Sequence, residues 1–259
     1  MSDTNDISGA PARKTLSRAE QERRTVLRSF AVGGAVTCAA LAGLLRTKLA
    51  KAETPHLRPP GAIDEDEFLA ACIKCGQCVQ VCPVQAIKLA DIHEGLGHGV
   101  PYVNARNQAC DFSCDAVQCV LACPTGALTH KIDKKEQVRM GVAELSHPDL
   151  CLARKGQGFK GLARGADTKG KLRYPEIDRW KPKPVASHPY DLDLCDLCVR
   201  QCPIEGAISL KSAAGLPNDK AKTPVVTDKC VGCGVCEMIC PTEPAAIRIV
   251  PRVTGRHSA

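Results

Sequence analysis

The sequence predicts an α+β fold of short strands and short helices arranged around cysteine-rich loops, and three observations predict it. Sixteen of the seventeen cysteines fall into four groups, and each group ends in Cys-Pro. A short apolar stretch follows each group, at residues 86–89, 127–129, 207–210 and 246–249. Aromatic residues make up only 3% of the chain, too few for an ordinary core of 259 residues. We therefore expect bound metal to tie distant segments together in place of a large core.

The spacing of the cysteines indicates iron–sulfur clusters. The first and fourth groups read C-x2-C-x2-C-x3-C-P, in which three close thiolates wrap one cubane and the fourth serves its neighbour. Sets of four give four [4Fe-4S] clusters. Zinc and disulfides are the alternatives, but zinc needs neither the third cysteine nor the final Cys-Pro, and such close cysteines make poor disulfide partners. The candidate ligands are Cys72, Cys75, Cys78, Cys82, Cys110, Cys114, Cys119, Cys123, Cys151, Cys195, Cys198, Cys202, Cys230, Cys233, Cys236 and Cys240.

The third group lacks its first cysteine, because Leu192 stands where the pattern expects one. Cys151 follows the last cysteine of the second group by 28 residues. The same 28-residue step leads from the first group to the second and from the third to the fourth. Cys151 is therefore the predicted first ligand of the third group, separated from the others by a long insertion. The alternative is a three-cysteine [3Fe-4S] site with Cys151 as a buried free thiol.

The first 52 residues have the features of a signal peptide. Arg23 and Arg24 precede an apolar stretch at residues 30–45, and Ala50-Lys51-Ala52 is an A-x-A cleavage pattern. Paired arginines mark the twin-arginine class, which suits a cargo that folds around its clusters before export. We expect a periplasmic protein. The alternative is an uncleaved anchor that holds the protein at the membrane, although the apolar stretch is short for a span.

The remainder divides into a linker and two repeats. Residues 53–63 contain adjacent prolines and form the linker. Residues 64–140 and 141–259 each hold two cysteine groups, as one bacterial two-cluster, ferredoxin-like unit does. Tandem pairing of the groups gives the shorter connections, and a nested pairing of the first with the fourth is also possible. Of the net charge of +7, +5 lies in residues 1–52, so the basic balance does not indicate nucleic-acid binding.

The second unit carries a basic insertion at residues 152–194, with ten Lys or Arg against five Asp or Glu. A segment of this length and composition predicts a surface loop. One interpretation is a docking surface for an acidic redox partner, such as a haem protein. The other is a mobile excursion without a partner.

These residues also carry a family resemblance. The twin-arginine start, the linker from Leu57 to Ile63 and the group from Cys72 to Cys78 resemble the ferredoxin-type proteins of periplasmic nitrate reductase operons and their methylamine-utilisation relatives. The resemblance implies a carrier that takes electrons from a quinol-oxidising membrane protein and passes them to a periplasmic redox protein. We see no nucleotide loop, flavin motif or acid–base group outside the cysteine loops, so we expect no enzymatic activity. The alternative is the iron–sulfur subunit of a molybdopterin oxidoreductase; a twin-arginine signal on this chain favours an independent protein.

Overall fold

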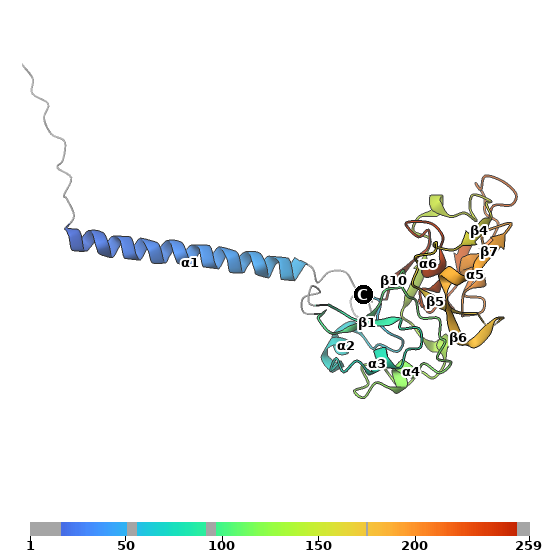
Figure 1. The fold of residues 1–259 in the computed structure, drawn as a ribbon, viewed down its shortest axis with the longest axis horizontal. Coiled ribbons are helices and arrows are strands. Elements are labelled where there is room, and N and C mark those ends of the chain that lie inside the picture. The colour runs from blue at the N-terminus through green and yellow to red at the C-terminus, as the bar shows by residue number, and fades with distance from the viewer. Residues whose placement is uncertain (1–16, 51–55, 92–96, 175, 253–259) are drawn as a thin grey trace, which may run out of the picture. The chain divides into compact units, whose positions relative to one another are not determined.

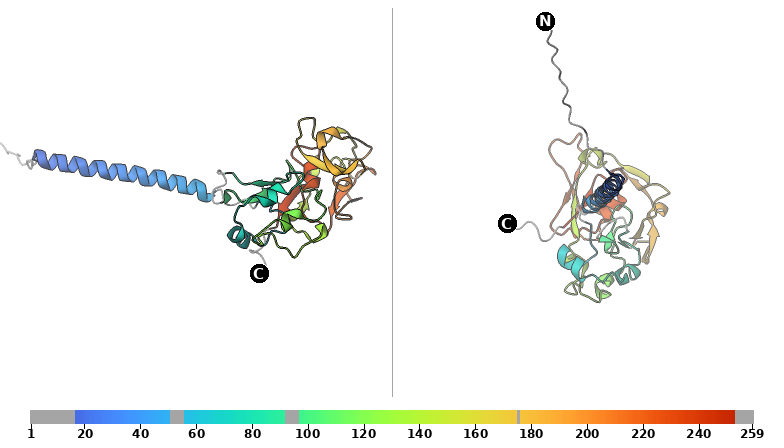
Figure 2. Two further views of the ribbon diagram at one scale, coloured as in Figure 1. Left: turned by 60° about the horizontal axis from the view of Figure 1, so that its bottom comes forward. Right: turned by 90° about the vertical axis from the view of Figure 1, so that its left-hand side faces the viewer.

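The computed structural model divides into an N-terminal segment, Met1–Lys51, and a compact domain, Ala52–Ala259. Figures 1 and 2 colour the chain from blue at the N-terminus to red at the C-terminus. The described residues are 17–50, 56–91, 97–174 and 176–252, with the backbone alone for 44–50, 179 and 180.

The described part of the N-terminal segment is helix α1 (Arg18–Ala50). A reciprocal cap starts it: Ser17 N–H donates to Glu20 Oε2 at 3.1 Å, and Glu20 N–H donates to Ser17 Oγ at 3.4 Å. The side chains of residues 18–43 are exposed, and Arg18–Gly43 is long and apolar enough to cross a membrane, a property that signal sequences share. The helix is consistent with a signal sequence. Lys51 and Ala52 of the expected cleavage pattern lie outside the described residues.

The compact domain contains short antiparallel strand pairs (Figure 1). The pairs outside the insertion are β1 (Ile87–Leu89) with β2 (Pro101–Val103), β3 (Gly141–Glu144) with β10 (Arg248–Pro251), and β8 (Ile208–Lys211) with β9 (Thr223–Val226). Each pair joins the apolar stretch after one cysteine group to the strand before another. β1–β2 and β8–β9 therefore occupy equivalent places in two repeats. In the other repeat, the place equivalent to the β3–β10 pair is taken by an isolated bridge between Ala62 and Leu128.

The α-helices of the compact domain are short because cysteine loops interrupt them. They are α2 (Glu65–Ala71), α3 (Gln77–Gln80), α4 (Gln118–Leu121), α5 (Leu197–Arg200) and α6 (Val235–Ile239). The last four each carry the third cysteine of one group, counting Cys151 as the first of its group. The two repeats of strand, cysteine loop, short helix and strand confirm the predicted fold class of two dicluster, ferredoxin-like parts.

The insertion is folded, and here the prediction of a surface loop is wrong. β4 (Phe159–Leu162) pairs with β7 (Pro189–Leu192), and between them β5 (Lys171–Tyr174) pairs with β6 (Asp178–Pro184). Figure 2 shows these strands, in yellow to orange, packed against the rest of the compact domain. Leu172 and Tyr174 are 2% and 1% exposed and share a hydrophobic cluster with Phe68 of α2. Buried apolar side chains hold the segment in place, so it is not a mobile excursion.

Candidate iron–sulfur sites

The first set of thiols joins the first cysteine group to the end of the second. Cys72, Cys75, Cys78 and Cys123 line one hollow, together with Phe68 of α2. Burial, together with the neighbouring Cys72, Cys75 and Cys123 thiols, raises the pKa of the Cys78 thiol to about 11. Cys75 is exposed, so this set reaches the protein surface.

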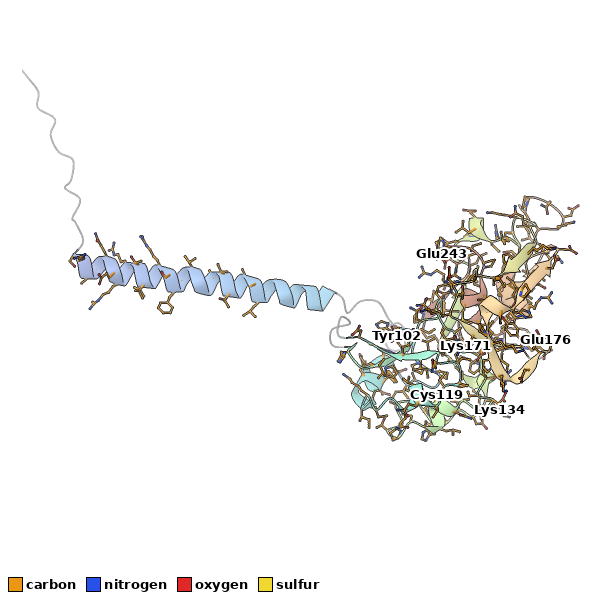
Figure 3. The ribbon with its side chains drawn as sticks, viewed as in Figure 1. Tyr102, Cys119, Lys134, Lys171, Glu176 and Glu243 are labelled. Atoms are coloured by element: carbon orange, nitrogen blue, oxygen red, sulfur yellow. The ribbon has the colours of Figure 1, made fainter. Side chains whose placement is uncertain are left out.

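The second set is made of Cys82 from the first group and Cys110, Cys114 and Cys119 from the second. Burial raises the pKa of Cys119 (labelled in Figure 3) to about 12, with contributions from Cys114 and Cys82. Cys110 is buried, and its pKa is raised by burial and by Cys119. The exchange of Cys82 and Cys123 between these two sets is the tandem pairing, which the sequence left open against the nested one.

The third set brings Cys151 to the third group across the insertion. Cys151, Cys195, Cys198 and Cys240 line one hollow. Burial raises the pKa of Cys198, as do the adjacent Cys195, Cys151 and Cys240 thiols. Leu192, at the position where the pattern expected a cysteine, lies in β7 opposite Phe159.

The fourth set is Cys202, Cys230, Cys233 and Cys236, which line a hollow walled by apolar side chains of β8, β9 and β10. Burial raises the pKa of Cys233 to about 12, and Cys202 and Cys230 add to the effect. Thiols with such raised pKa values hold their protons at neutral pH. Bound iron would deprotonate them, because a coordinated thiol is a thiolate.

The three hollows fit a group of one size. Their space free of protein atoms, openings included, is about 360 Å³ for the first set, 370 Å³ for the third and 340 Å³ for the fourth. Among the described residues no three His, Cys, Asp or Glu side chains come close enough to hold a single metal ion. Four thiols around a hollow suit a multi-iron cage, whose ligands bind separate irons.

The turns after three of the four Cys-Pro pairs direct a backbone N–H at the sulfur. Ala86 N–H donates to Cys82 Sγ at 3.3 Å, Leu128 N–H to Cys123 Sγ at 3.4 Å, and Ala246 N–H to Cys240 Sγ at 3.3 Å. Proline ends the preceding helix and turns the chain back over the sulfur. Such bonds stabilise a thiolate, and around iron–sulfur clusters they raise the reduction potential.

Two glycines have a packing reason that the sequence did not reveal. Gly232 has φ of 72°, and a Cβ there would lie 2.3 Å from the Gly141 backbone nitrogen. Gly234 has φ of 90°, and a Cβ would lie 2.5 Å from the Ala105 side chain. Both need glycine because other chain segments pass close by in a left-handed turn. They seat the fourth group against its neighbours.

The four sets follow one another in a row. Cys119 of the second set interacts with Cys78 of the first, and Cys236 of the fourth with Cys198 of the third. The second and fourth sets meet where Cys110 N–H donates to Cys233 C=O at 3.0 Å. The spatial order is therefore first, second, fourth, third. The first and third sets are the ends of the row.

The insertion clamps the loop that begins the second group. Gln108 Oε1 accepts from Lys171 N–H at 2.8 Å, and Gln108 Nε2 donates to Lys171 C=O at 2.9 Å. Asp111, 5% exposed, accepts from Arg173 N–H at 2.7 Å, and the Arg173 guanidinium pairs with Asp115. β5 thus covers the residues on both sides of Cys110.

Arg106 fastens this loop to the fourth group. Its guanidinium donates to the carbonyls of Glu237 at 2.6 Å, Cys240 at 2.9 Å and Thr242 at 2.7 Å, and pairs with Glu243 at 2.8 Å. Its Nε is the one buried side-chain polar atom without a partner in the described chain. Sequence reasoning missed Arg106 and Gln108, since neither belongs to a motif. The only available signal was their place just before an irregular cysteine group.

The comparisons with known proteins agree with these sites. The pattern of a 4Fe-4S dicluster domain matches residues 71–152 and 193–243, on either side of the insertion. The methylamine utilization ferredoxin-type protein MauM of Methylorubrum extorquens is 36% identical over 90% of each chain, and that of Methylophilus methylotrophus is 37% identical over 92% of this chain and 90% of its own. The ferredoxin-type protein NapG of Escherichia coli is 34% identical over 91% of this chain and 88% of its own. No solved structure matches.

The fold and the cysteine sets define an iron–sulfur protein with dicluster domains that carry multiple [4Fe-4S] clusters. A protein of this kind is an electron-transfer protein, consistent with the predicted carrier. The chain belongs to the family of ferredoxin-type proteins that includes NapG and MauM.

Proposed function

We propose that the sixteen cysteines hold four [4Fe-4S] clusters, one in each set, and that the protein carries electrons between a membrane donor and a periplasmic acceptor. The observation that carries the proposal is the gathering of four thiols, from cysteines far apart in sequence, around each of three hollows. In the second set the thiols of Cys82, Cys110, Cys114 and Cys119 likewise lie close together. A bound cubane supplies one-electron storage with little rearrangement. The protein supplies the thiolates, the N–H donors to sulfur and the apolar walls.

The tandem pairing of the cysteine sets supports a division into two ferredoxin-like units, at residues 64–140 and 141–259, joined at the Cys110–Cys233 hydrogen bond. The row of sets gives the carrier two separate ends. Each end can face a different partner, as a relay requires. The exposed Cys75 makes the first set one accessible end.

The partners follow from the family and the N-terminal helix. We propose a quinol-oxidising membrane protein as donor and a periplasmic redox protein, such as a haem protein, as acceptor, in a system of the nitrate reductase or methylamine-utilisation type. The support is the similarity to NapG and MauM and the signal-like α1 helix. The same support favours folding in the cytoplasm and export by the twin-arginine route.

The test measures iron and cluster signals in anaerobically purified protein. We expect about sixteen irons per chain. Cys151→Ala should lose or convert one cluster, whereas Cys38→Ala, on the exposed surface of α1, should keep the full content. Fully occupied wild-type protein with about twelve irons would contradict the four-cluster proposal. Unchanged iron and electron paramagnetic resonance in Cys151→Ala would remove Cys151 from the ligands.

A further inference from the structure

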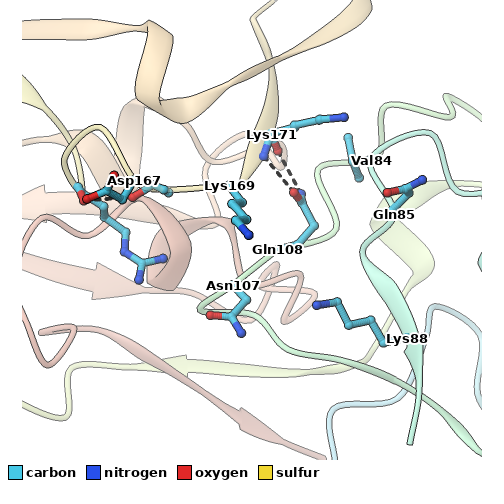
Figure 4. Close-up of a pocket in the computed structure, with 10 residues that line it drawn as sticks. Val84, Gln85, Lys88, Asn107, Gln108, Asp167, Lys169 and Lys171 are labelled. Atoms are coloured by element: carbon cyan, nitrogen blue, oxygen red, sulfur yellow. Dashed lines mark hydrogen bonds between the residues drawn. The ribbon is translucent and has the colours of Figure 1, made fainter.

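A basic pocket lies between the first ferredoxin-like unit and the insertion. Its volume is about 570 Å³. One wall comes from β1 and the turn before it, with Val84, Gln85 and Lys88; the opposite wall comes from the insertion, with Arg164, Asp167, Thr168, Lys169 and Lys171; Asn107 and Gln108 lie between the two walls. In Figure 4 the side chains of Lys88 and Lys169 extend into the pocket from different sides.

The pocket lining carries a net positive charge. Four basic side chains line it against the single carboxylate of Asp167. Within the described chain, Lys88, Lys169 and Lys171 make no ion pair. Arg164 lies 4.0 Å from Glu243, and burial together with the nearby Arg106 lowers its pKa. Like charges held around a concave wall concentrate the positive potential there, which attracts carboxylates.

The pocket leads to the second cysteine set. Val84 and Gln85 belong to the turn after Cys82, whose sulfur accepts the Ala86 N–H. On the other side, Gln108 stands two residues before Cys110 and is fixed by both of its bonds to Lys171. Two stretches of backbone on the pocket wall thus end at thiols of one set. A molecule bound here would lie beside the first ferredoxin-like unit.

Arg173 does not belong to this surface. Its side chain is 13% exposed, and its guanidinium pairs with Asp115 and donates to Phe112 C=O at 3.2 Å. In the insertion, Arg173 therefore anchors the segment to the loop of the second cysteine group, whereas Lys169 and Lys171 line the pocket.

We propose that the pocket binds a carboxylate-rich segment of a redox partner protein and that this partner exchanges electrons with the first unit. The binding half stands on the pocket alone; the electron half rests on the proposed carrier function. Lys88 and Lys169 supply the attraction, and Arg164 sets the positive field behind them. The step itself is the transfer of one electron between partner and protein, with no bond made or broken.

The first experiment measures binding of a fluorescent hexaglutamate peptide to the holoprotein at low salt. We expect Lys88→Glu with Lys169→Glu to weaken binding about tenfold, because each change replaces attraction by repulsion. Lys211→Glu with Lys220→Glu makes the same charge change at exposed positions outside the pocket, and should change the affinity less than about twofold. Equal iron content would show that both variants fold. Equal binding by the two variants would overturn the docking site.

The second experiment follows reoxidation of the dithionite-reduced protein by two small oxidants of opposite charge. The pocket variant should react more slowly with hexacyanoferrate(III) and faster with hexaammineruthenium(III), and raising the salt should remove both differences. The control variant should show neither difference. Peptide binding that depends on the pocket without any change in these rates would overturn electron exchange at the first unit. Wild-type protein that lacks clusters would instead refute the carrier function, while the peptide result would stand.

Discussion

The clamp between Gln108 and β5 gives a prediction that can be worked from the structure. Gln108→Ala removes both bonds to Lys171, 2.8 and 2.9 Å long, from a side chain that is 8% exposed. At about 1 kcal/mol net for each bond, local opening of the insertion should become easier by about 2 kcal/mol. Since about 1.4 kcal/mol is a factor of ten, amide exchange in the segment should accelerate about 30-fold.

Hydrogen–deuterium exchange with mass spectrometry measures this change peptide by peptide. The acceleration should be confined to residues 163–174, and the β8–β9 pair should keep its protection. Gln157→Ala is the matched control, because Gln157 is an exposed residue of the same insertion and its side chain makes no hydrogen bond within the described chain. Equal exchange in the two variants would refute the view that Gln108 holds the insertion on the cysteine loop.

Three further predictions concern Arg106, Arg173 and the N-terminal arginines. Arg106→Lys loses the planar fork that reaches three carbonyls, at a cost of about 3 kcal/mol, so the midpoint of thermal cluster bleaching should fall by roughly 6–12 °C; an unchanged midpoint would show that a lysine suffices. Arg173→Ala should hasten cluster loss in air, measured by absorbance, yet leave hexaglutamate affinity within about twofold of wild type, whereas a large loss of affinity would place Arg173 on the docking surface. Arg23→Lys with Arg24→Lys should trap the precursor in the cytoplasm with its clusters, and normal periplasmic appearance on fractionation would exclude the twin-arginine route.

The sequence predicted the features that repeat and missed those that depend on single long-range contacts. Three of the apolar stretches that follow the cysteine groups lie at residues 86–89, 207–210 and 246–249, and β1, β8 and β10 begin there. Cysteine spacing alone also led to Cys151, which the structure places beside Cys195 and Cys198. Both predictions used local patterns that fixed turn geometry imposes on each repeat.

The insertion shows why the remainder could not be predicted. Its hydrophobic anchors alternate in β5, where Leu172 and Tyr174 are buried and Lys171 is exposed. That alternation was short and lay within many glycines, prolines and charges. The contacts that decide its fold join Lys171 to Gln108 and Arg173 to Asp111, some sixty residues apart, and no local propensity reports such a pair.

The pairing of β3 with β10 has a consequence for how the protein is made. The first ferredoxin-like unit can form its last strand contact once Leu128 is synthesised, because Ala62 bridges to Leu128. The second ferredoxin-like unit cannot complete its strand pairing until residues 248–251 are synthesised, since they pair with residues 141–144. Cys240, whose thiol belongs with Cys151, also arrives late. Completion of the third site therefore requires that translation has passed Cys240. A cell that exports only folded chains could use this order to keep unfinished copies inside.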